Sequence, residues 1–452
     1  MGHETTIRSG TVRGHAEGGI IQFHAIPYAR PPVGKLRFCL PQEPEPWEGV
    51  LDTAKRGVAA PQYASDLDLP MGPIGLPTGE DCLTLSVSTP ALDAHLPVAV
   101  WFHGGANCYG GGDLPWYDGA SLARAANTVV VNINYRLGPF GFLFVRGVQD
   151  KNLSIEDQMM ALRWIQDNIR SFGGDPKRVT LFGQSAGANA IAHILSREDS
   201  DGLFSQIILQ SASLGRGNHL LSDAYEVGDA VLRNLGIDPQ SNSVLQQLQE
   251  ASVDAILQAA DAVPDPLKAK HQGMYFKPVM DQWHTPEQTA QQAAAMAAKR
   301  SIRVMTGFTK DETHAFSTAR DPASLENLEK GQHLRYELPG GIFAGTAADL
   351  GCEVWKYEFD WAAPDSIFDA CHCLELPFLF GNLPAWHAPF LAGADPVQMQ
   401  YLKETLQSAW GAFFHGETPD EAFWPRYTSK ARKIKYFDNK ANPVGTEPKY
   451  RI

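Results

Sequence analysis

The sequence of 452 residues has few cysteines, an excess of acidic over basic residues, and no long apolar run. Six cysteines spread over this length exclude a disulfide scaffold and favour free thiols. The net charge of −13 repels phosphate groups, so we expect no nucleic-acid partner. The longest apolar stretches, such as Leu96–Phe102, are far too short to span a bilayer, so we expect no membrane partner.

The N-terminal segment lacks the apolar core of a secretory signal. Residues Met1–Arg8 are mostly polar and, together with the expected free thiols, they predict a cytoplasmic chain. The composition is globular, with 44% hydrophobic and 20% charged residues, so we do not expect long disordered regions. The length is compatible with about three domains or with one large α/β unit.

Signatures of bound cofactors are scarce. The glycines Gly110–Gly112 are not followed by Lys and Ser or Thr, so they do not form a phosphate-binding loop. Cys371, His372 and Cys373 form a dense group, but an extended segment would turn His372 away from the two thiols. Since no second Cys/His cluster completes a zinc site, we expect neither a metal nor another cofactor.

Short β-branched runs alternate with helical patterns through the first half of the chain. We predict strands at Val98–Phe102, Thr128–Asn134, Val179–Phe182 and Ile207–Gln210, and an amphipathic helix at Asp157–Phe172. This alternation predicts an α/β fold with a central, mostly parallel, twisted sheet and helices on both faces.

The second half is richer in helical patterns. Thr285 and Pro286 mark a helix start, and Asp395 is the expected N-cap of a helix over Pro396–Phe414. No internal repeat or long linker separates two halves of the chain. We therefore predict one domain over residues 1–452, with helical excursions at about 218–300 and 313–350.

The strongest chemical motif is Gly183–Gly187, which reads Gly-Gln-Ser-Ala-Gly. It follows a β-branched strand and opens a predicted helix, which is the context of a nucleophile elbow. Small residues around Ser185 let the chain turn sharply and expose the hydroxyl, and the helix N-terminus favours developing negative charge. The alternative interpretation is a tight turn in which Ser185 only caps the helix.

A second glycine-containing segment follows the predicted strand that ends at Phe102. His103-Gly104-Gly105-Ala106 stands where the oxyanion loop belongs in this topology. Its backbone N–H groups would stabilise the oxyanion of a tetrahedral intermediate, and glycine allows a close approach to substrate. The alternative is a plain glycine turn.

The serine needs a base, and the sequence contains 14 histidines. In this chain order the acid follows the serine and the histidine comes last, which leaves a shorter set of candidates. These are His314, His333, His372, His387 and His415. His314 is disfavoured because it is only two residues from Glu312, and the residues alone leave the choice among the others open.

Several further motifs run nearly the length of the chain. They are Phe23–Ala29, Pro32–Phe38, Glu80–Leu83, Asn134–Gly138, Asp157–Gln158, Phe172–Pro176 and Trp424–Pro425. With the serine motif, these segments resemble type-B carboxylesterases, the family that includes the cholinesterases, and most of all its bacterial members. The resemblance implies an α/β-hydrolase fold.

The resemblance also implies roles for individual residues. Ser185 matches the nucleophile, Glu312 the acid and His372 the base, with Asp311 as the competing assignment for the acid. The N–H groups of Gly105, Ala106 and Ala186 would form the oxyanion hole, and Ser211 would be a supporting hydroxyl near the triad.

The implied function is a serine hydrolase that cleaves small-molecule carboxylic esters through an acyl-enzyme, without a cofactor. The same groups would serve a carbamate, lactone or amide hydrolase, and a remote alternative is a non-catalytic, adhesion-type relative. Only 60 positions separate Glu312 from His372, fewer than in most of the family, so we expect a reduced helical cap and a more open entrance.

Overall fold

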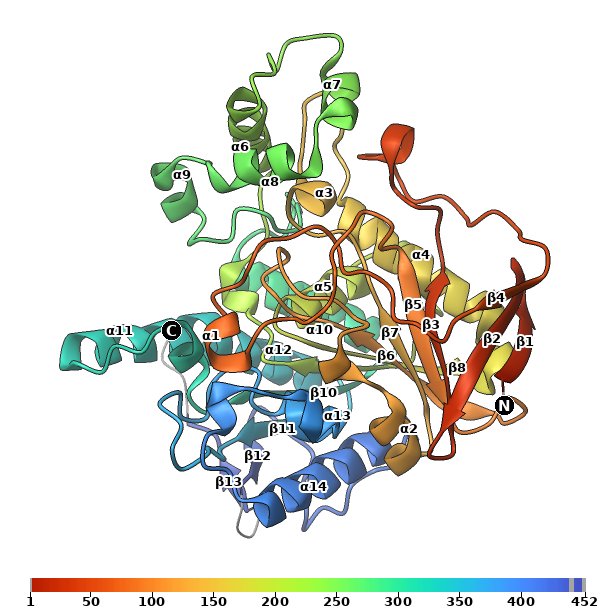
Figure 1. Ribbon diagram of the computed structural model, residues 1–452. Helices are drawn as coiled ribbons and strands as arrows, with labels where there is room; N and C mark the ends of the chain where they lie inside the picture. Colours follow the sequence, from red (N-terminus) through yellow and green to blue (C-terminus); the bar gives the residue numbers. More distant parts are fainter. Residues whose placement is uncertain (1, 439–442, 449–452) are drawn as a thin grey trace.

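The computed structural model describes residues 2–438 and 443–448. Within them, one 13-stranded sheet crosses the molecule, with the order β1-β2-β3-β5-β7-β6-β8-β9-β10-β11-β12-β13 and β4 beside β2 (Figure 1). The pairs from β7 to β12 are parallel, as is the short pair β2–β4, and the remaining outer pairs are antiparallel. The predicted mostly parallel sheet is thus confirmed.

The strands are β1 (Gly2–Ile7), β2 (Gly10–Glu17), β3 (Ile20–Pro27), β4 (Val50–Asp52), β5 (Thr84–Thr89), β6 (Leu96–Phe102), β7 (Val129–Ile133), β8 (Gly174–Gln184), β9 (Gln206–Gln210), β10 (Arg303–Thr309), β11 (Val354–Phe359), β12 (Lys433–Phe437) and β13 (Val444–Thr446).

The helices are α1 (Asp68–Met71), α2 (Ala120–Ala126), α3 (Gly138–Phe142), α4 (Leu153–Asn168), α5 (Ala186–Leu195), α6 (Leu221–Asn234), α7 (Val244–Glu250), α8 (Val253–Asp261), α9 (Asp265–Lys270), α10 (Pro286–Lys299), α11 (Pro322–Gln332), α12 (Leu338–Asp349), α13 (Leu376–Phe380) and α14 (Pro396–Phe414).

Two hydrophobic cores lie on the two faces of the sheet. On one face the strands pack against α4, α5, α10 and α12, with Ile165 and Ile191 among the fully buried side chains. On the other they pack against α2, α13 and α14, with Trp101 and Trp410 at the centre. Burial on both faces explains why the central strands are continuously apolar instead of alternating.

Helix starts follow the expected capping chemistry. Thr285 and Gln288 form a reciprocal capping box at the start of α10, and the Asp395 carboxylate accepts two backbone N–H groups at the start of α14. The helix predicted over Asp157–Phe172 is shifted, because α4 already begins at Leu153 and ends at Asn168. A 3-10 turn follows and ends at Gly173, which is left-handed.

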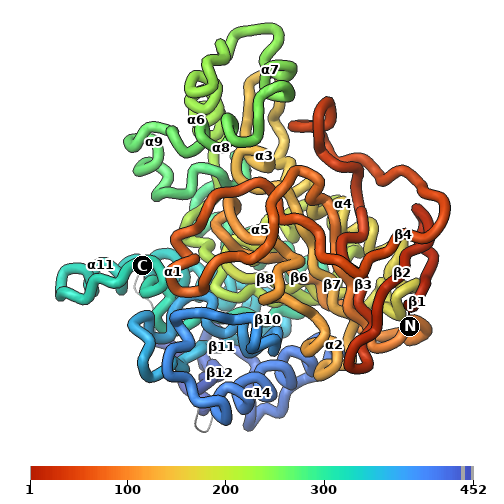
Figure 2. Tube along the Cα trace, viewed as in Figure 1, coloured from red at the N-terminus to blue at the C-terminus, as the bar shows by residue number. Residues whose placement is uncertain are grey.

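The helices of the second half occupy two regions. Helices α6 to α9 gather at one end of the molecule, away from α14 (Figure 2). Helix α11, a π-helical turn η7 (His333–Glu337) and α12 follow one another between β10 and β11. None of the helices in the described ranges is long and apolar enough to cross a membrane.

Two of the sequence motifs meet in a buried ion pair. Arg136, from the Asn134–Gly138 motif, donates to both carboxylate oxygens of Asp157 at 2.6 and 2.8 Å, and it also donates to the Cys39 carbonyl at 2.8 Å. Side-chain exposures of 3% and 0% show that water cannot replace either partner. The pair therefore ties the loop after β7 to α4.

We expect Asp157→Asn to lower the free energy of unfolding by about 3–5 kcal/mol, because it leaves the buried Arg136 cation uncompensated. Urea denaturation measures the change. The matched control is Glu4→Gln, which removes the exposed partner of Arg13 and is expected to cost less than about 1 kcal/mol. Equal losses for the two variants would contradict the structural role of the buried pair.

Candidate active site

Ser185 is the single residue between β8, which ends at Gln184, and α5, which begins at Ala186. Its backbone angles are φ 56° and ψ −122°, a conformation that non-glycine residues rarely adopt. Gly187 is required for this turn, since a β-carbon there would lie 2.1 Å from the Phe102 carbonyl oxygen. The chain therefore reverses sharply at Ser185, as the Gly-x-Ser-x-Gly pattern predicts.

The Ser185 side chain is half-buried at the N-terminus of α5. Its backbone N–H donates to the Gln210 carbonyl at 2.9 Å, which ties the turn to the end of β9. The hydroxyl makes no hydrogen bond with any residue that the structure describes. A free hydroxyl at a helix N-terminus is available for chemistry in which negative charge develops nearby.

Glu312 and His372 form a fully buried pair. Glu312 follows β10 at the start of the short helix η6 (Glu312–Phe316), and its Oε2 is bonded to His372 Nδ1. Its Oε1 accepts a hydrogen bond from the backbone N–H of Thr309 at 2.9 Å. The backbone N–H of His372 donates to the backbone carbonyl of Glu312 at 3.3 Å. The exposed fraction of each residue is 0%, so the carboxylate fixes both the tautomer and the orientation of the imidazole.

Asp311, the competing assignment, points elsewhere. Its Oδ2 accepts the backbone N–H of Ala370 at 3.2 Å, so it anchors the segment that leads to His372 and does not contact the imidazole. Among the other candidate histidines, His314 is bonded to Asp369 at 2.7 Å and His415 to the Ala126 carbonyl at 2.8 Å. Of the two acids, only Glu312 is thus bonded to His372.

Gln184 is a neighbour of His372 that the sequence motifs did not predict. Its side-chain Nε2 lies 3.0 Å from His372 Nε2. With the imidazole proton on Nδ1 facing Glu312, the amide N–H donates to Nε2. The only sequence signal was the position of Gln184 inside the serine motif, directly before the expected nucleophile.

The loop after β6 lies directly against the serine. A β-carbon on Gly104 would be 3.2 Å from the Ser185 β-carbon. Gly105 has φ 112°, and a side chain there would lie 2.2 Å from the Tyr109 carbonyl oxygen, so only glycine fits. The N–H groups of Gly105, Ala106 and Ala186 have no acceptor in the described part of the chain, which leaves them available as donors.

The expected extended conformation at Cys371–Cys373 needs correction. Residues Cys371–Cys373 enter a turn and are not extended, with Cys373 at φ 74°, so the strand-like alternation predicted there is wrong. Both thiols are buried, and burial raises the pKa of each well above its usual range. Among the described residues, no group of three or more His, Cys, Asp and Glu side chains could hold a metal ion.

Ser211 lies near the site without a bond to it. The residue is 1% exposed and its N–H donates to the Gly307 carbonyl at 2.7 Å, but its hydroxyl has no hydrogen-bond partner. The structure therefore does not connect the Ser211 hydroxyl to Ser185, Glu312 or His372.

The cavity beside the loop is narrow, about 30 Å³, and mostly apolar. Its lining includes Met71, Gly105, Trp116, Tyr117, Gln184 and Cys373. The rings of Phe316 and Tyr336 each lie 5.4 Å from the His372 ring. Aromatic rings therefore lie close to His372, and Met71 of α1 lines the cavity.

A second buried carboxylate lies behind the pair. Glu375 Oε1 accepts the Gln210 side-chain amide at 3.1 Å, and Gln210 in turn accepts the Trp410 indole N–H at 3.2 Å. Glu375 Oε2 has no hydrogen-bond partner. Burial, together with the nearby Glu312, raises the pKa of Glu375 from 4.5 to about 7.

A serine held in a strained strand-to-helix turn on a parallel sheet, with a buried Glu–His pair beside it, defines an α/β hydrolase of the serine hydrolase class. The profile described as "Carboxylesterase family" matches residues 2–338. The chain belongs to the carboxylesterase family and is a carboxylic ester hydrolase.

Several relatives are similar over almost their whole length. Para-nitrobenzyl esterase of Bacillus subtilis is 36% identical, covering 97% of this chain and 96% of the relative. The probable N-octanoylanthranilate hydrolase of Rhodococcus erythropolis is also 36% identical, covering 96% and 97%. A solved structure titled thermophilic PNB esterase has a TM-score of 0.86 and 32% identity, covering 98% of this chain and 97% of that one. These matches confirm the predicted fold and family.

We expect Glu375→Gln to stabilise the protein increasingly as the pH rises. The raised pKa means that the folded state keeps the Glu375 proton where the unfolded chain has lost it, so stability falls between about pH 4.5 and 7. Glutamine does not ionise, so urea denaturation is expected to show a relative gain of about 2–3 kcal/mol from about pH 5 to about pH 8. The exposed Glu48→Gln is the control, and an equal pH response of both variants would refute the assignment.

Proposed function

We propose that this esterase cleaves small-molecule esters through an acyl-enzyme on Ser185, with His372 as base and Glu312 as the orienting acid. The observation that carries the proposal is the buried Glu312–His372 bond next to the strained turn at Ser185. Neither a metal nor a cofactor enters the proposed steps.

In acylation, His372 Nε2 takes the proton of Ser185 as Oγ forms a bond to the ester carbonyl carbon. The carbonyl electron pair moves to oxygen, where the N–H groups of Gly105, Ala106 and Ala186 stabilise it. The intermediate then re-forms the carbonyl and expels the alcohol, which takes the proton from His372. Glu312 stabilises the imidazolium between the two transfers.

In deacylation, His372 removes a proton from water as the water oxygen attacks the acyl carbon. Collapse of this second intermediate breaks the bond to Ser185 Oγ, which recovers its proton from His372. The carboxylic acid leaves and the enzyme returns to its starting state.

Gln184 takes part in the resting state. Because His372 Nε2 accepts the Gln184 amide at 3.0 Å, the Ser185 hydroxyl has to replace this donor before proton transfer. The amide therefore orients the ring between turnovers and is exchanged for the serine hydroxyl when substrate binds.

An amide bond is the second candidate target. The relative from Rhodococcus erythropolis carries the name of an N-octanoylanthranilate hydrolase, which denotes an N-acyl bond. The same serine, histidine and acid would cleave amides, carbamates or lactones. A non-catalytic, adhesion-type role is disfavoured by the retained Ser185, Glu312 and His372.

We further propose that the enzyme works in the cytoplasm. All six cysteines are unpaired, which suits a reducing compartment.

Ser185→Ala is expected to lose labelling by a fluorophosphonate probe and to lower kcat by at least about 1000-fold on 4-nitrophenyl butyrate. The loss follows from removal of the only oxygen that forms the acyl bond. Mass spectrometry of the labelled peptide identifies the modified residue. Labelling of the variant at the level of wild type would refute the proposal.

Glu312→Gln and Asp311→Asn separate the two acids. We expect kcat to fall by about 10⁴-fold in Glu312→Gln, because the amide cannot hold the required tautomer or stabilise the imidazolium. Asp311→Asn keeps an acceptor for the Ala370 N–H and is expected to stay within about threefold of wild type. A larger loss in Asp311→Asn than in Glu312→Gln would reverse the assignment.

A further inference from the structure

Three cationic residues from distant parts of the chain lie together beside the candidate active site. Lys277 Nζ donates to the Arg216 carbonyl at 2.7 Å. A β-carbon on Gly215 would lie 2.5 Å from the Arg335 α-carbon, so the backbones on either side are in contact. Arg216, Lys277 and Arg335 therefore share one small region, which we call the cation cluster.

The cation cluster borders the reacting groups through its sequence neighbours. Tyr336 follows Arg335, and its ring lies 5.4 Å from the His372 ring. Burial raises the pKa of the Tyr336 phenol, and the positive charges of Arg216 and Arg335 partly offset this rise. On the other side, the carbonyl of Phe276, next to Lys277, accepts the Asn107 side-chain amide at 3.1 Å, directly after the loop with Gly105 and Ala106.

No carboxylate in the described residues forms an ion pair with any member of the cluster. Asp223, which acts electrostatically on Lys277, is itself paired with Lys270 at 2.9 Å.

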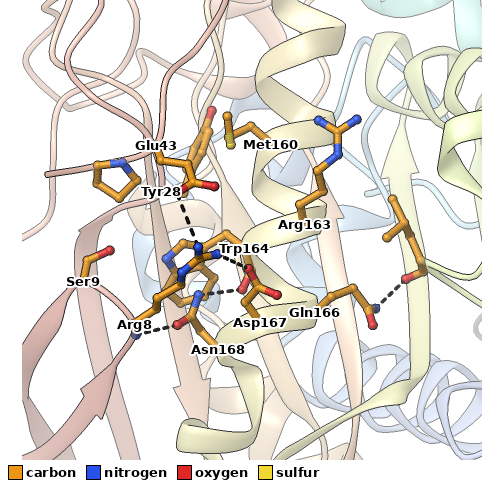
Figure 3. Close-up of a pocket in the computed structure, with 12 residues that line it drawn as sticks. Arg8, Ser9, Tyr28, Glu43, Met160, Arg163, Trp164, Gln166, Asp167 and Asn168 are labelled. Carbon is orange, nitrogen blue, oxygen red and sulfur yellow. Dashed lines mark hydrogen bonds and ion pairs between the residues drawn. The ribbon is translucent and has the colours of Figure 1, made fainter. Parts of the chain in front are cut away.

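Two arginines on another face of the molecule have carboxylate partners. In the hollow of Figure 3, Arg8 lies 3.2 Å from Asp167 and 3.8 Å from Glu43. Arg163, which lines the same hollow, is paired with Asp199 at 3.0 Å. The cation cluster differs from these two arginines in having no carboxylate partner among the described residues, and all three of its members are half-buried.

The cluster carries an electrostatic cost without a counter-charge. Burial and the neighbouring Arg216 lower the pKa of Lys277 to about 8. Burial and Arg335 lower the pKa of Arg216 from its usual value. A bound anion would relieve both effects, and the planar guanidinium groups are suited to bidentate contact with a carboxylate.

Space for such a ligand lies beside the cluster. A hollow of about 510 Å³ is lined by Gly215 and Arg335 and by the apolar side chains of Leu334, Leu338 and Ile342. Lys330 and Glu287 also line it, so its charged lining is two cations and one acid. Arg335 is the member of the cation cluster that lines this hollow, so an aliphatic chain against the apolar wall would place its charge beside Arg335.

We propose that the preferred esters carry a carboxylate a few bonds from the scissile carbonyl, bound by Arg216, Lys277 and Arg335. The inference rests on the proposed function and names the substrate class of that same site. A carboxylate on the acyl part of the ester and one on the alcohol part would bind these cations in the same way. Two pairs of esters distinguish the two positions.

The test compares charged and neutral esters of matched size on the full-length enzyme. The first pair is mono-4-nitrophenyl adipate and its methyl ester, with the charge on the acyl side. The second pair is the hexanoate ester of 4-hydroxybenzoate and that of methyl 4-hydroxybenzoate, with the charge on the alcohol side. We expect kcat/KM to favour the charged member of one pair by roughly tenfold or more.

The double variant Arg216→Gln/Arg335→Gln is expected to lose roughly tenfold to 100-fold in kcat/KM on the charged ester while keeping its rate on the neutral ester. Arg8→Gln, which removes a paired cation, is the matched control and should change neither rate. The wild-type preference should also weaken as sodium chloride rises from about 0.05 to about 0.5 M.

Equal rates on both members of both pairs in wild type would overturn the proposal, as would an equal loss on charged and neutral esters in a folded double variant. If the variant does not fold, inhibition of the wild-type enzyme tests the proposal instead. Adipate is then expected to inhibit hydrolysis of the neutral ester more strongly than hexanamide does, and equal inhibition would overturn the proposal. Absence of Ser185-dependent hydrolysis of the neutral esters would instead count against the proposed function.

Discussion

The site depends on one backbone constraint, the reversal of the chain at Ser185. The residue is held at positive φ between the last residue of β8 and the first of α5, and its N–H is tied to the Gln210 carbonyl. The adjacent glycine is needed because any side chain would collide with the carbonyl at the end of β6. The strain is sustained by the packed sheet below, and it keeps the hydroxyl at the sheet edge.

The other groups reach this edge because the central strands are parallel. Glu312 follows β10 and His372 follows β11 in the chain. The carboxyl ends of these two strands lie at the same edge of the sheet as the carboxyl end of β8, where Ser185 is located. Behind them, Glu375, Gln210 and Trp410 form a buried hydrogen-bonded chain. The sheet topology, and not sequence proximity, assembles the site.

Much of the fold could be predicted from local patterns. The buried parallel strands could be predicted because they are continuously apolar, and several turns because glycines flank them. The starts of α10 and α14 could be predicted because the capping residues lie within a few positions of the helix. The Gly183–Gly187 pattern was informative because its constraints act within five positions. The choice between Asp311 and Glu312 was beyond local reasoning, because adjacent acids differ only in the partners that the fold gives them.

Other features depend on tertiary packing, which local sequence patterns do not determine. The contact between Gln184 and His372, the turn at Cys373 and the narrowness of the cavity all arise from segments far apart in the chain. The same holds for Arg216, Lys277 and Arg335, whose proximity becomes visible only when three loops are packed together.

A crystal structure of the enzyme after reaction with a phosphonate ester tests the assignment of the active site most directly. The proposed mechanism predicts a covalent bond from Ser185 Oγ to phosphorus, with the phosphoryl oxygen about 2.7–3.1 Å from the N–H groups of Gly105, Ala106 and Ala186. It also predicts that His372 Nε2 has exchanged Gln184 for an oxygen at the reaction centre. A phosphonyl group on another residue, or a phosphoryl oxygen that faces none of these donors, would contradict it.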